Sequence, residues 1–249
     1  MSDHIRISRH DGVLHLAINR PEKKNALTGA MYDAMVEAIH AADADAQTGA
    51  IVICGTPGVF TAGNDIGDFL KSAGSIETVP AFRFIKTIAA CTTPLIAAVD
   101  GLAIGIGTTM ILHCDLVYAT PASMFKMPFV ELALVPEAAS SLLLPQRIGM
   151  AKASEFLLLG EAFDAAEAHR LGLVNAVVAP DALAAHAQAK ARKLASLPRE
   201  ALAATRRLLR GDTAAVLERI ALEGQVFGKQ IASSEARETF MKFMTRAKG

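Results

Sequence analysis

Two glycine-rich segments of the chain have the composition of sites where main-chain N–H groups bind an anion or a polarised oxygen atom. The first is Val59-Phe60-Thr61-Ala62-Gly63-Asn64-Asp65-Ile66, and the second is Asp100-Gly101-Leu102-Ala103-Ile104-Gly105-Ile106-Gly107. Glycine allows backbone conformations that turn successive N–H groups toward one point. A helix that follows the second segment would add its positive end. Either segment, taken alone, is also typical of an ordinary turn after a strand.

Nucleotide binding is one alternative for these segments, and it fails at specific positions. After Gly105-Ile106-Gly107 the chain continues as Thr108-Thr109-Met110, where a dinucleotide-binding fingerprint would have its third glycine. The segments also lack the lysine of a Walker phosphate-binding loop. The sequence therefore does not support either phosphate-binding motif.

The hydrophobic pattern predicts a layered α/β fold with mostly parallel strands that would hold both segments. Near the N-terminus, Asp11-Gly12 joins two alternating strands, and Thr28 can cap an amphipathic helix over 28–42. The further predictions are strands over 50–55, 95–99, 116–119 and 174–178, a helix over 78–91, and helices after residue 182. We expect a core domain over residues 1–195 and a helical region over 196–249 that packs on this core or on a neighbouring subunit.

The composition excludes several classes of protein. The 249 residues include 25 basic and 25 acidic side chains and are 52% hydrophobic, so a folded core is expected and a nucleic-acid partner is not. The three cysteines and seven histidines lack the spacing of a metal site, and an odd number of cysteines fits a reducing cytoplasm. The N-terminus does not resemble a signal peptide. The most membrane-like stretch, 95–112, contains Asp100 and three glycines, so no membrane partner is expected.

Five segments together resemble the crotonase superfamily, which is also called the enoyl-CoA hydratase/isomerase family. They are the two glycine-rich segments, Asn19-Arg20-Pro21-Glu22-Lys23-Lys24-Asn25-Ala26-Leu27, and the stretches 114–119 and 166–174. The resemblance covers nearly the whole chain and implies a spiral of repeated ββα units with a C-terminal helical extension. It also implies acyl-CoA thioester substrates, a place in fatty-acid β-oxidation, and homotrimers or dimers of trimers closed by the C-terminal helices. Coenzyme A is part of such a substrate, so no further cofactor is implied.

The resemblance also implies the roles of particular residues. The backbone N–H groups of Asn64 and Ile106 would hold the thioester oxygen and stabilise an enolate. The side of the site that binds the adenine of coenzyme A would lie at Ala26, Ala62, Asp65 and Ile66. Lys24 is a candidate for the coenzyme A phosphates, although a charge exposed to solvent is the simpler interpretation of this residue.

The carboxylates distinguish the members of this family from one another. In the hydratases that this chain resembles, two glutamates stand where Thr109 and Phe129 stand here, and neither of these side chains is an acid or a base. The segment Leu134-Val135-Pro136-Glu137-Ala138-Ala139-Ser140-Ser141 instead resembles the peroxisomal-type Δ3,Δ2-enoyl-CoA isomerases, in which this glutamate is the single catalytic base. We therefore predict a Δ3,Δ2-enoyl-CoA isomerase with Glu137 as its acid and base, in an apolar pocket that raises the pKa of this carboxyl group.

Three alternatives remain open at this stage. Glu137 follows Pro136 and precedes a predicted helix, where an acidic side chain also stabilises the helix dipole. The chain could be an enoyl-CoA hydratase or another acyl-CoA enzyme of the same superfamily, because these share the backbone site. A noncatalytic acyl-CoA-binding protein with the same fold is the third alternative.

Overall fold

Two β-sheets form the frame of the protein in the computed structural model, which describes residues 3–71 and 79–246, with side chains for 3–68 and 79–242. The first sheet has the strand order β1-β2-β3-β5-β7-β10. Its strands are β1 (Ile5–His10), β2 (Val13–Ile18), β3 (Ala50–Cys54), β5 (Leu95–Val99), β7 (Leu116–Ala119) and β10 (Ala176–Val177). The hairpin of β1 and β2 is antiparallel and the other pairs are parallel, as the hydrophobic pattern predicts.

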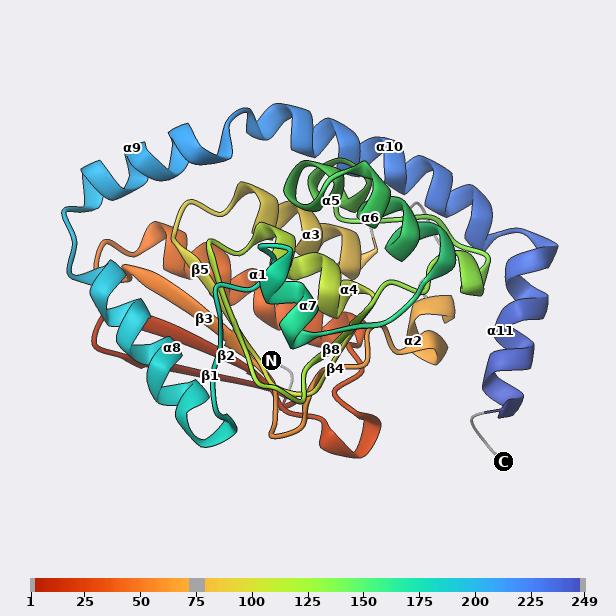
Figure 1. Ribbon diagram of the computed structural model, residues 1–249, viewed down its shortest axis with the longest axis horizontal. Helices are drawn as coiled ribbons and strands as arrows, with labels where there is room; N and C mark the ends of the chain where they lie inside the picture. Colours follow the sequence, from red (N-terminus) through yellow and green to blue (C-terminus); the bar gives the residue numbers. More distant parts are fainter. Residues whose placement is uncertain (1–2, 72–78, 247–249) are drawn as a thin grey trace.

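The second sheet has the order β4-β6-β8-β9. Its strands are β4 (Val59–Thr61), β6 (Leu102–Ile104), β8 (Met124–Lys126) and β9 (Phe163–Asp164). The chain passes from one sheet to the other repeatedly, because β3, β5 and β7 of the first sheet are followed by β4, β6 and β8 of the second. Helices follow the first two of these pairs, so the α/β fold with a spiral of ββα units is confirmed (Figure 1).

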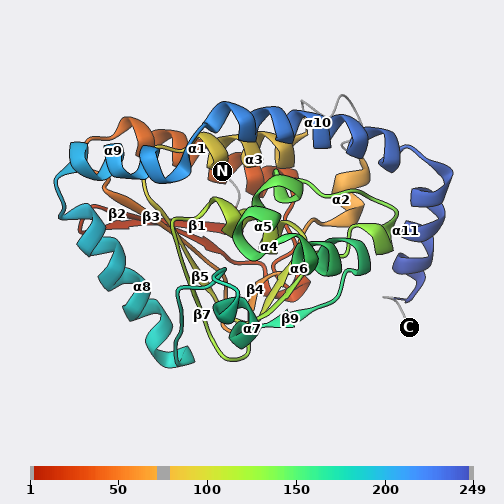
Figure 2. The ribbon, with the colours of Figure 1, turned by 45° about the horizontal axis from the view of Figure 1, so that its top comes forward.

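Helices cover both faces of the first sheet because side chains alternate along each strand. Val13 faces the cluster that contains Leu183 and Ala187 of α8 (Pro180–Ala195). Its neighbour Leu14 belongs to the main core, which also contains the buried faces of α1 (Gly29–Ala44) and α3 (Pro80–Ala90). Figure 2 shows the sheet between α8 and the layer of α1 and α3. Each large apolar side chain buried in this way contributes about 1.5–3 kcal/mol.

The predicted helix starts follow local chemistry. The Met31 N–H donates to the Thr28 side chain at 3.4 Å, which confirms the predicted cap of α1. The helix predicted over 78–91 is observed as α3, although residue 78 lies outside the described residues. The strand predicted over 174–178 is wrong in length, because only the two residues of β10 pair with β7. The backbone of Leu173 and Val174 instead bonds the Ala168 carbonyl at the end of α7 (Ala165–Arg170).

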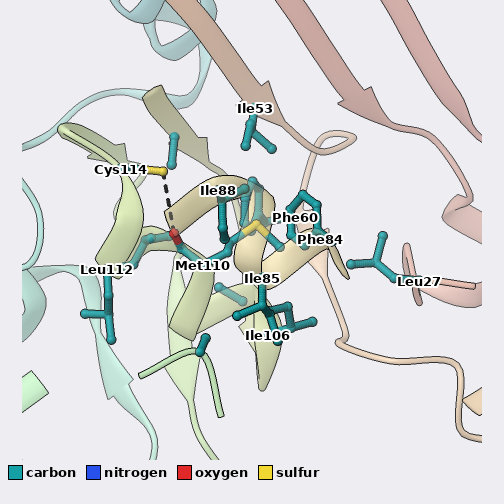
Figure 3. Close-up of a cluster of buried hydrophobic side chains, with 14 of the residues drawn as sticks. Leu27, Ile53, Phe60, Phe84, Ile85, Ile88, Ile106, Met110, Leu112 and Cys114 are labelled. Atoms are coloured by element: carbon teal, nitrogen blue, oxygen red, sulfur yellow. Dashed lines mark hydrogen bonds between the residues drawn. The ribbon is translucent and has the colours of Figure 1, made fainter. Parts of the chain in front are cut away.

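Both glycine-rich segments are anchored in one core cluster through an apolar side chain (Figure 3). Phe60 of the first segment and Ile106 of the second are 0% and 1% exposed, and Leu27 joins them from the segment before α1. The Ile106 side chain lies among core residues that include Ile85 of α3 (Figure 3). Because the side chains of Phe60 and Ile106 are buried in the core, they fix the position of the backbone in both glycine-rich segments.

The C-terminal region consists of α9 (Arg199–Arg210), α10 (Thr213–Ile231) and α11 (Ser234–Arg246). Figure 1 shows α9 and α10 in succession along one edge of the molecule. Phe227 of α10 packs edge-on against Phe82 of α3, with ring centroids 5.7 Å apart. Leu208 and Leu209 of α9 are exposed, but the use of residues 196–249 in oligomerisation stays a prediction. None of the helices among the described residues is long and apolar enough to cross a membrane.

Four short helices complete the elements that position the site. They are α2 (Ile66–Lys71), α4 (Ile106–Thr109), α5 (Ser140–Ile148) and α6 (Met150–Ser154). The 3-10 helix η3 (Met110–His113) continues α4, and a second 3-10 helix, η4 (Val130–Leu132), lies between β8 and α5. The α4 and η3 turns together form the helix expected after the second glycine-rich segment.

Candidate active site

A cavity of about 610 Å³ lies between the two glycine-rich segments, the loop between β8 and α5, and helices α3, α10 and α11. Its apolar wall includes Phe82, Phe129, Leu132, Leu134, Phe227 and Phe240. Its polar groups are the side chains of Asn64, Lys126, Glu131, Glu137, Thr239 and Lys242. A mostly apolar cavity with a few polar groups is typical of a small-molecule site.

The first glycine-rich segment presents the N–H of Asn64, just after β4. Leu27 donates its N–H to the Gly63 carbonyl and accepts the Asp65 N–H, both at 2.8 Å. In a parallel bridge of this kind, the peptide groups of the residue between, Asn64, face the opposite side. Because Asn64 also lines the cavity, its N–H is available to a ligand there.

Asn25 fixes this segment from behind. Its side-chain amide donates to the Val59 carbonyl at 2.8 Å, and the Thr61 hydroxyl donates to the Asn25 carbonyl at 2.7 Å. Asn25 is completely buried and has a positive φ of 55°, a conformation that asparagine tolerates better than most residues. The Asn25 network therefore ties the loop before α1 to β4.

In the second glycine-rich segment the chain turns at Gly105, and α4 begins at Ile106. Gly105 has φ 57° and ψ −117°, a backbone conformation that favours glycine. Its carbonyl accepts the N–H groups of Thr108 and Thr109 at 2.9 and 3.0 Å. The N–H of Ile106, as the first in the helix, has no partner inside the helix, so it is free to bond a group in the cavity that Ile106 lines.

The two segments lie against each other so closely that glycine is needed at the contact. A Cβ atom on Gly63 would stand 2.9 Å from the Ile104 carbonyl oxygen, and one on Gly107 would stand 2.7 Å from Thr61 Cγ2. The predicted pair of N–H donors, on Asn64 and Ile106, is therefore brought to one cavity. Such preorganised donors stabilise negative charge that develops on an oxygen atom.

Glu137 supplies the only buried carboxyl group among the described residues that line this cavity. Its side chain comes from the loop before α5 and accepts a hydrogen bond from the Thr109 hydroxyl. Burial raises the pKa of Glu137 to about 8, the Thr109 bond opposes this shift, and the charge of Glu223 adds to it. A carboxyl group with this pKa can take up and release a proton near neutral pH. The alternative role of Glu137, an acidic side chain that stabilises the dipole of the following helix, does not account for its burial in the cavity.

The hydratase positions named above contain no carboxylate. Phe129 is 6% exposed and forms part of the apolar wall, whereas Thr109 bonds Glu137. Glu131 lines the cavity as well, but its carboxylate is half exposed and pairs with the Lys126 ammonium at 2.9 Å. The geometry thus offers one buried acid with a hydroxyl group beside it.

Tyr32 of α1 is a residue of the site that sequence reasoning missed. Its hydroxyl group donates to Asn64 Oδ1 at 2.5 Å. Burial and the nearby Glu137 charge raise the pKa of Tyr32 well above its ordinary value, so the hydroxyl stays protonated. The apolar spacing of α1 gives no sign of this role, because Tyr32 also fits a core position.

The residues predicted to bind coenzyme A lie together, on the segments around 24–27 and 62–66. The Ala62 N–H donates to the Lys24 carbonyl at 2.9 Å. The guanidinium of Arg20, which sequence reasoning did not single out, bonds the Ala26 carbonyl at 3.0 Å and the Asp65 carboxylate at 2.7 Å. Ala62 and Ile66 line the cavity and the Lys24 side chain is exposed. Binding of coenzyme A by Lys24, Ala26, Ala62, Asp65 and Ile66 stays a prediction.

Arginine side chains hold the end of the helix that begins at Ile106 and the aspartate that follows it. Arg147 and Arg210 donate to the carbonyls of Leu112 and His113 at the end of η3, where a positive charge stabilises the helix dipole. Arg206 and Arg210 both pair with the Asp115 carboxylate, which also accepts the Leu95 N–H at 2.8 Å. Asp115 is thus structural.

The fold and the paired glycine-rich segments define a crotonase-type protein. The family model described as enoyl-CoA hydratase/isomerase matches residues 8–249, and the chain belongs to this family. Its activity is therefore of the crotonase type, on acyl-CoA thioesters.

Similar proteins include both hydratases and isomerases. The chain is 33% identical to a probable enoyl-CoA hydratase of Rhodobacter capsulatus, over 99% of this chain and 97% of that protein. It is 31% identical to enoyl-CoA delta isomerase 2 of Rattus norvegicus, over 97% of this chain and 63% of that protein. The solved structure of Pseudomonas aeruginosa OdaA superposes with a TM-score of 0.95 and 42% identity, over 98% of this chain and 99% of that one. Because hydratases and isomerases are similarly identical to this chain, the relatives do not distinguish hydration from isomerisation.

Proposed function

We propose that this protein is a Δ3,Δ2-enoyl-CoA isomerase, which moves the double bond of a 3-enoyl-CoA to the trans-2 position. The observation that carries the proposal is the buried carboxyl group of Glu137, which accepts the Thr109 hydroxyl and has no second buried carboxyl group beside it among the described residues that line the cavity. A double-bond shift needs one group that removes a proton from C2 and returns it to C4. One carboxyl group with a pKa near neutrality can do both.

The proposed reaction uses the backbone donors of both segments. The N–H groups of Asn64 and Ile106 hold the thioester oxygen while the Glu137 carboxylate removes a proton from C2. Electrons of the broken C2–H bond form a dienolate, whose negative charge lies on the held oxygen. Glu137 then gives the same proton to C4. The electrons of the C3=C4 bond form the new C4–H bond, the electrons of the C1=C2 bond form the C2=C3 bond, and the thioester carbonyl re-forms. No water or external oxidant enters this balance.

The apolar wall of the cavity suits the hydrocarbon chain of an acyl substrate. Phe82, Phe129 and Leu134 line the cavity that contains Glu137. They would exclude water from the dienolate and keep the pKa of the base high. The acyl-CoA substrate brings its own coenzyme A, so we propose no further cofactor. A homotrimer or dimer of trimers in the cytoplasm stays part of this proposal.

The second candidate is an enoyl-CoA hydratase, which the names of the bacterial relatives favour. Hydration needs a base that activates water and an acid that protonates C2. Glu137 alone would have to serve both steps, since Thr109 and Phe129 supply no second carboxylate. The test is one purified enzyme with a 3-enoyl-CoA and with crotonyl-CoA, followed side by side by NMR. Isomerisation much faster than hydration supports the proposal, and the reverse ratio rejects it.

A further inference from the structure

Glu223 of α10 is a buried carboxylate outside the cavity wall that reaches the loop carrying Glu137. It is 6% exposed. Its two oxygens accept the Ala139 N–H at 2.6 Å, the Ser141 N–H at 3.0 Å and the Ser141 hydroxyl at 2.5 Å. A carboxylate from another helix thus caps the start of α5, at a point where the cap residue, Ala139, has no side-chain oxygen.

The loop that Glu223 holds has an unfavourable backbone conformation. Ala138 and Ala139 both have positive φ, at 60° and 54°, and two successive left-handed residues other than glycine require outside support. Support comes from three contacts around the turn. The Ala138 carbonyl bonds His113 Nε2 at 2.8 Å, the Ser140 hydroxyl donates to the Glu137 carbonyl at 2.6 Å, and Glu223 binds the Ala139 N–H.

We propose that Glu223 is a positioning residue that keeps the Glu137 carboxyl group in the cavity by holding the left-handed turn at Ala138 and Ala139. This inference rests on the proposed function for its kinetic consequences. The left-handed turn sets the direction of the backbone after Glu137, and the hydrogen bond from the Ala139 N–H to Glu223 of α10 holds this turn in place. Without this bond, the turn would relax toward ordinary backbone conformations and move the carboxyl group.

The charge of Glu223 also acts on Glu137 directly. Among the described residues, the Glu137 carboxyl group accepts the Thr109 hydroxyl of α4 and interacts through its charge with Tyr32 of α1 and Glu223 of α10. Burial raises the pKa of Glu223, and the bonds from Ser141 and Ala139 together with the charge of Arg219 oppose this shift by favouring the ionised form. Arg219, one turn before Glu223, donates to the Ser141 hydroxyl at 3.2 Å. The neutral form of Glu137 is favoured by the negative charge of Glu223. Replacing Glu223 by a neutral side chain therefore lowers the pKa of Glu137.

The test variant is Glu223→Gln, with Glu218→Gln as its matched control on the exposed side of the same helix. A glutamine has one carbonyl oxygen, so it cannot accept at both sites that Glu223 now serves. We expect kcat for the 3-enoyl-CoA to fall about 10- to 100-fold, as for a small displacement of a catalytic group. KM should change little, because the cavity wall is intact, and the rise of kcat/KM with pH should shift to lower pH. Glu218→Gln should match the wild type in all three quantities.

A titration without substrate separates this inference from the proposed function. In protein labelled with ¹³C at the glutamate carboxyl carbon, the resonance missing from Glu137→Gln identifies Glu137. Its midpoint should lie near pH 8 in the wild type and lower in Glu223→Gln. An unchanged midpoint together with an unchanged kcat would overturn the role of Glu223. Absence of isomerisation by the wild type would contradict the proposed function and leave the titration test valid.

If Glu223→Gln does not fold, the double variant Glu223→Gln/Ala139→Gly provides the same test. Glycine adopts the left-handed conformation of residue 139 without strain, so it replaces the support that Glu223 gives. We expect this variant to fold and to have a kcat below that of the wild type, with a Glu137 midpoint lower than in the wild type because the charge is still missing. A double variant with the wild-type midpoint would overturn the electrostatic part of the role.

Discussion

The Thr109 hydroxyl at the end of α4 donates a hydrogen bond to the Glu137 carboxyl group, which lies in the loop before α5, 28 residues further along the chain. Thr109 ends the short helix that presents the Ile106 N–H, so this bond joins the proposed base to the proposed oxyanion site. Neither residue is exposed. The relationship implies that the protonation of Glu137 and the position of the acyl oxygen are set by the same helix.

Replacing Thr109 by valine keeps the shape of the side chain and removes its hydrogen bond. This bond favours the ionised form of Glu137, and a bond to a charged group is worth about 1.5–3 kcal/mol. The pKa of Glu137 should therefore rise, and kcat/KM at neutral pH should fall about tenfold. A pH profile of kcat/KM checks this expectation. Thr109→Ser, which retains the hydroxyl, should keep most of the activity, and a profile for Thr109→Val identical to that of the wild type would contradict it.

The raised pKa of Glu137 also makes the folding stability depend on pH. Glutamate has an ordinary pKa of 4.5, against about 8 in the folded protein, so the folded state binds more protons between these values. The free energy of unfolding therefore decreases as pH rises through this window. Glu137→Gln lacks this effect, so its stability relative to the wild type should increase from pH 4.5 to pH 8. Urea unfolding at several pH values measures this difference, and a difference that is constant with pH would contradict the burial of the carboxyl group.

Gly63→Ala tests the close contact between the two glycine-rich segments. Gly63 has φ 92°, and a Cβ there would stand 2.9 Å from the Ile104 carbonyl oxygen. A strained backbone residue costs about 1–3 kcal/mol, and here the strain would also move the Asn64 N–H. We expect a loss of kcat of about 100-fold in addition to lower thermal stability. Gly172→Ala, at φ 79° with open space around it, is the control for strain alone. Equal loss of kcat in both variants would argue against a role of Asn64 in catalysis.

Tyr32→Phe removes the hydrogen bond that holds the Asn64 side chain. The bond is 2.5 Å long and joins a buried hydroxyl of α1 to the first glycine-rich segment. A lost hydrogen bond of this type reduces stability by about 1 kcal/mol. Because the Asn64 N–H belongs to the same residue, we also expect a moderate loss of kcat with little change in KM. Thermal unfolding and steady-state kinetics test both parts, and an unaltered kcat would show that the Asn64 side chain does not position its backbone.

Much of the frame follows from local sequence. The alternating strands and the Thr28 cap depend on neighbouring residues, and these were predictable. The length of β10 was not, because Leu173 and Val174 donate to the Ala168 carbonyl and the chain bonds β7 only from residue 175 onward. Local patterns do not report such competition between tertiary partners.

The site shows the same division. Asn64, Ile106 and Glu137 could be predicted because they lie in segments that resemble the family. In the structure all three line one cavity. Tyr32 and Glu223 could not, since their partners are 32 and 82 or more residues away in the sequence. One feature of the sequence does indicate that Glu223 has a partner. It is a charged residue beside Gly224, on the face of α10 that also contains the buried Ile220 and Phe227, and a buried charge of this kind needs a partner.

Glu137→Gln, assayed with a 3-enoyl-CoA of medium chain length, tests the central claim most directly. Glutamine fits the same space and can still bond Thr109, but it cannot carry the proton. General acid–base catalysis is worth about 100- to 10,000-fold, so we predict a loss of kcat in this range with acyl-CoA binding retained. A Glu137→Gln enzyme that isomerises 3-enoyl-CoA at the wild-type rate would contradict the assignment of Glu137 as the proton shuttle.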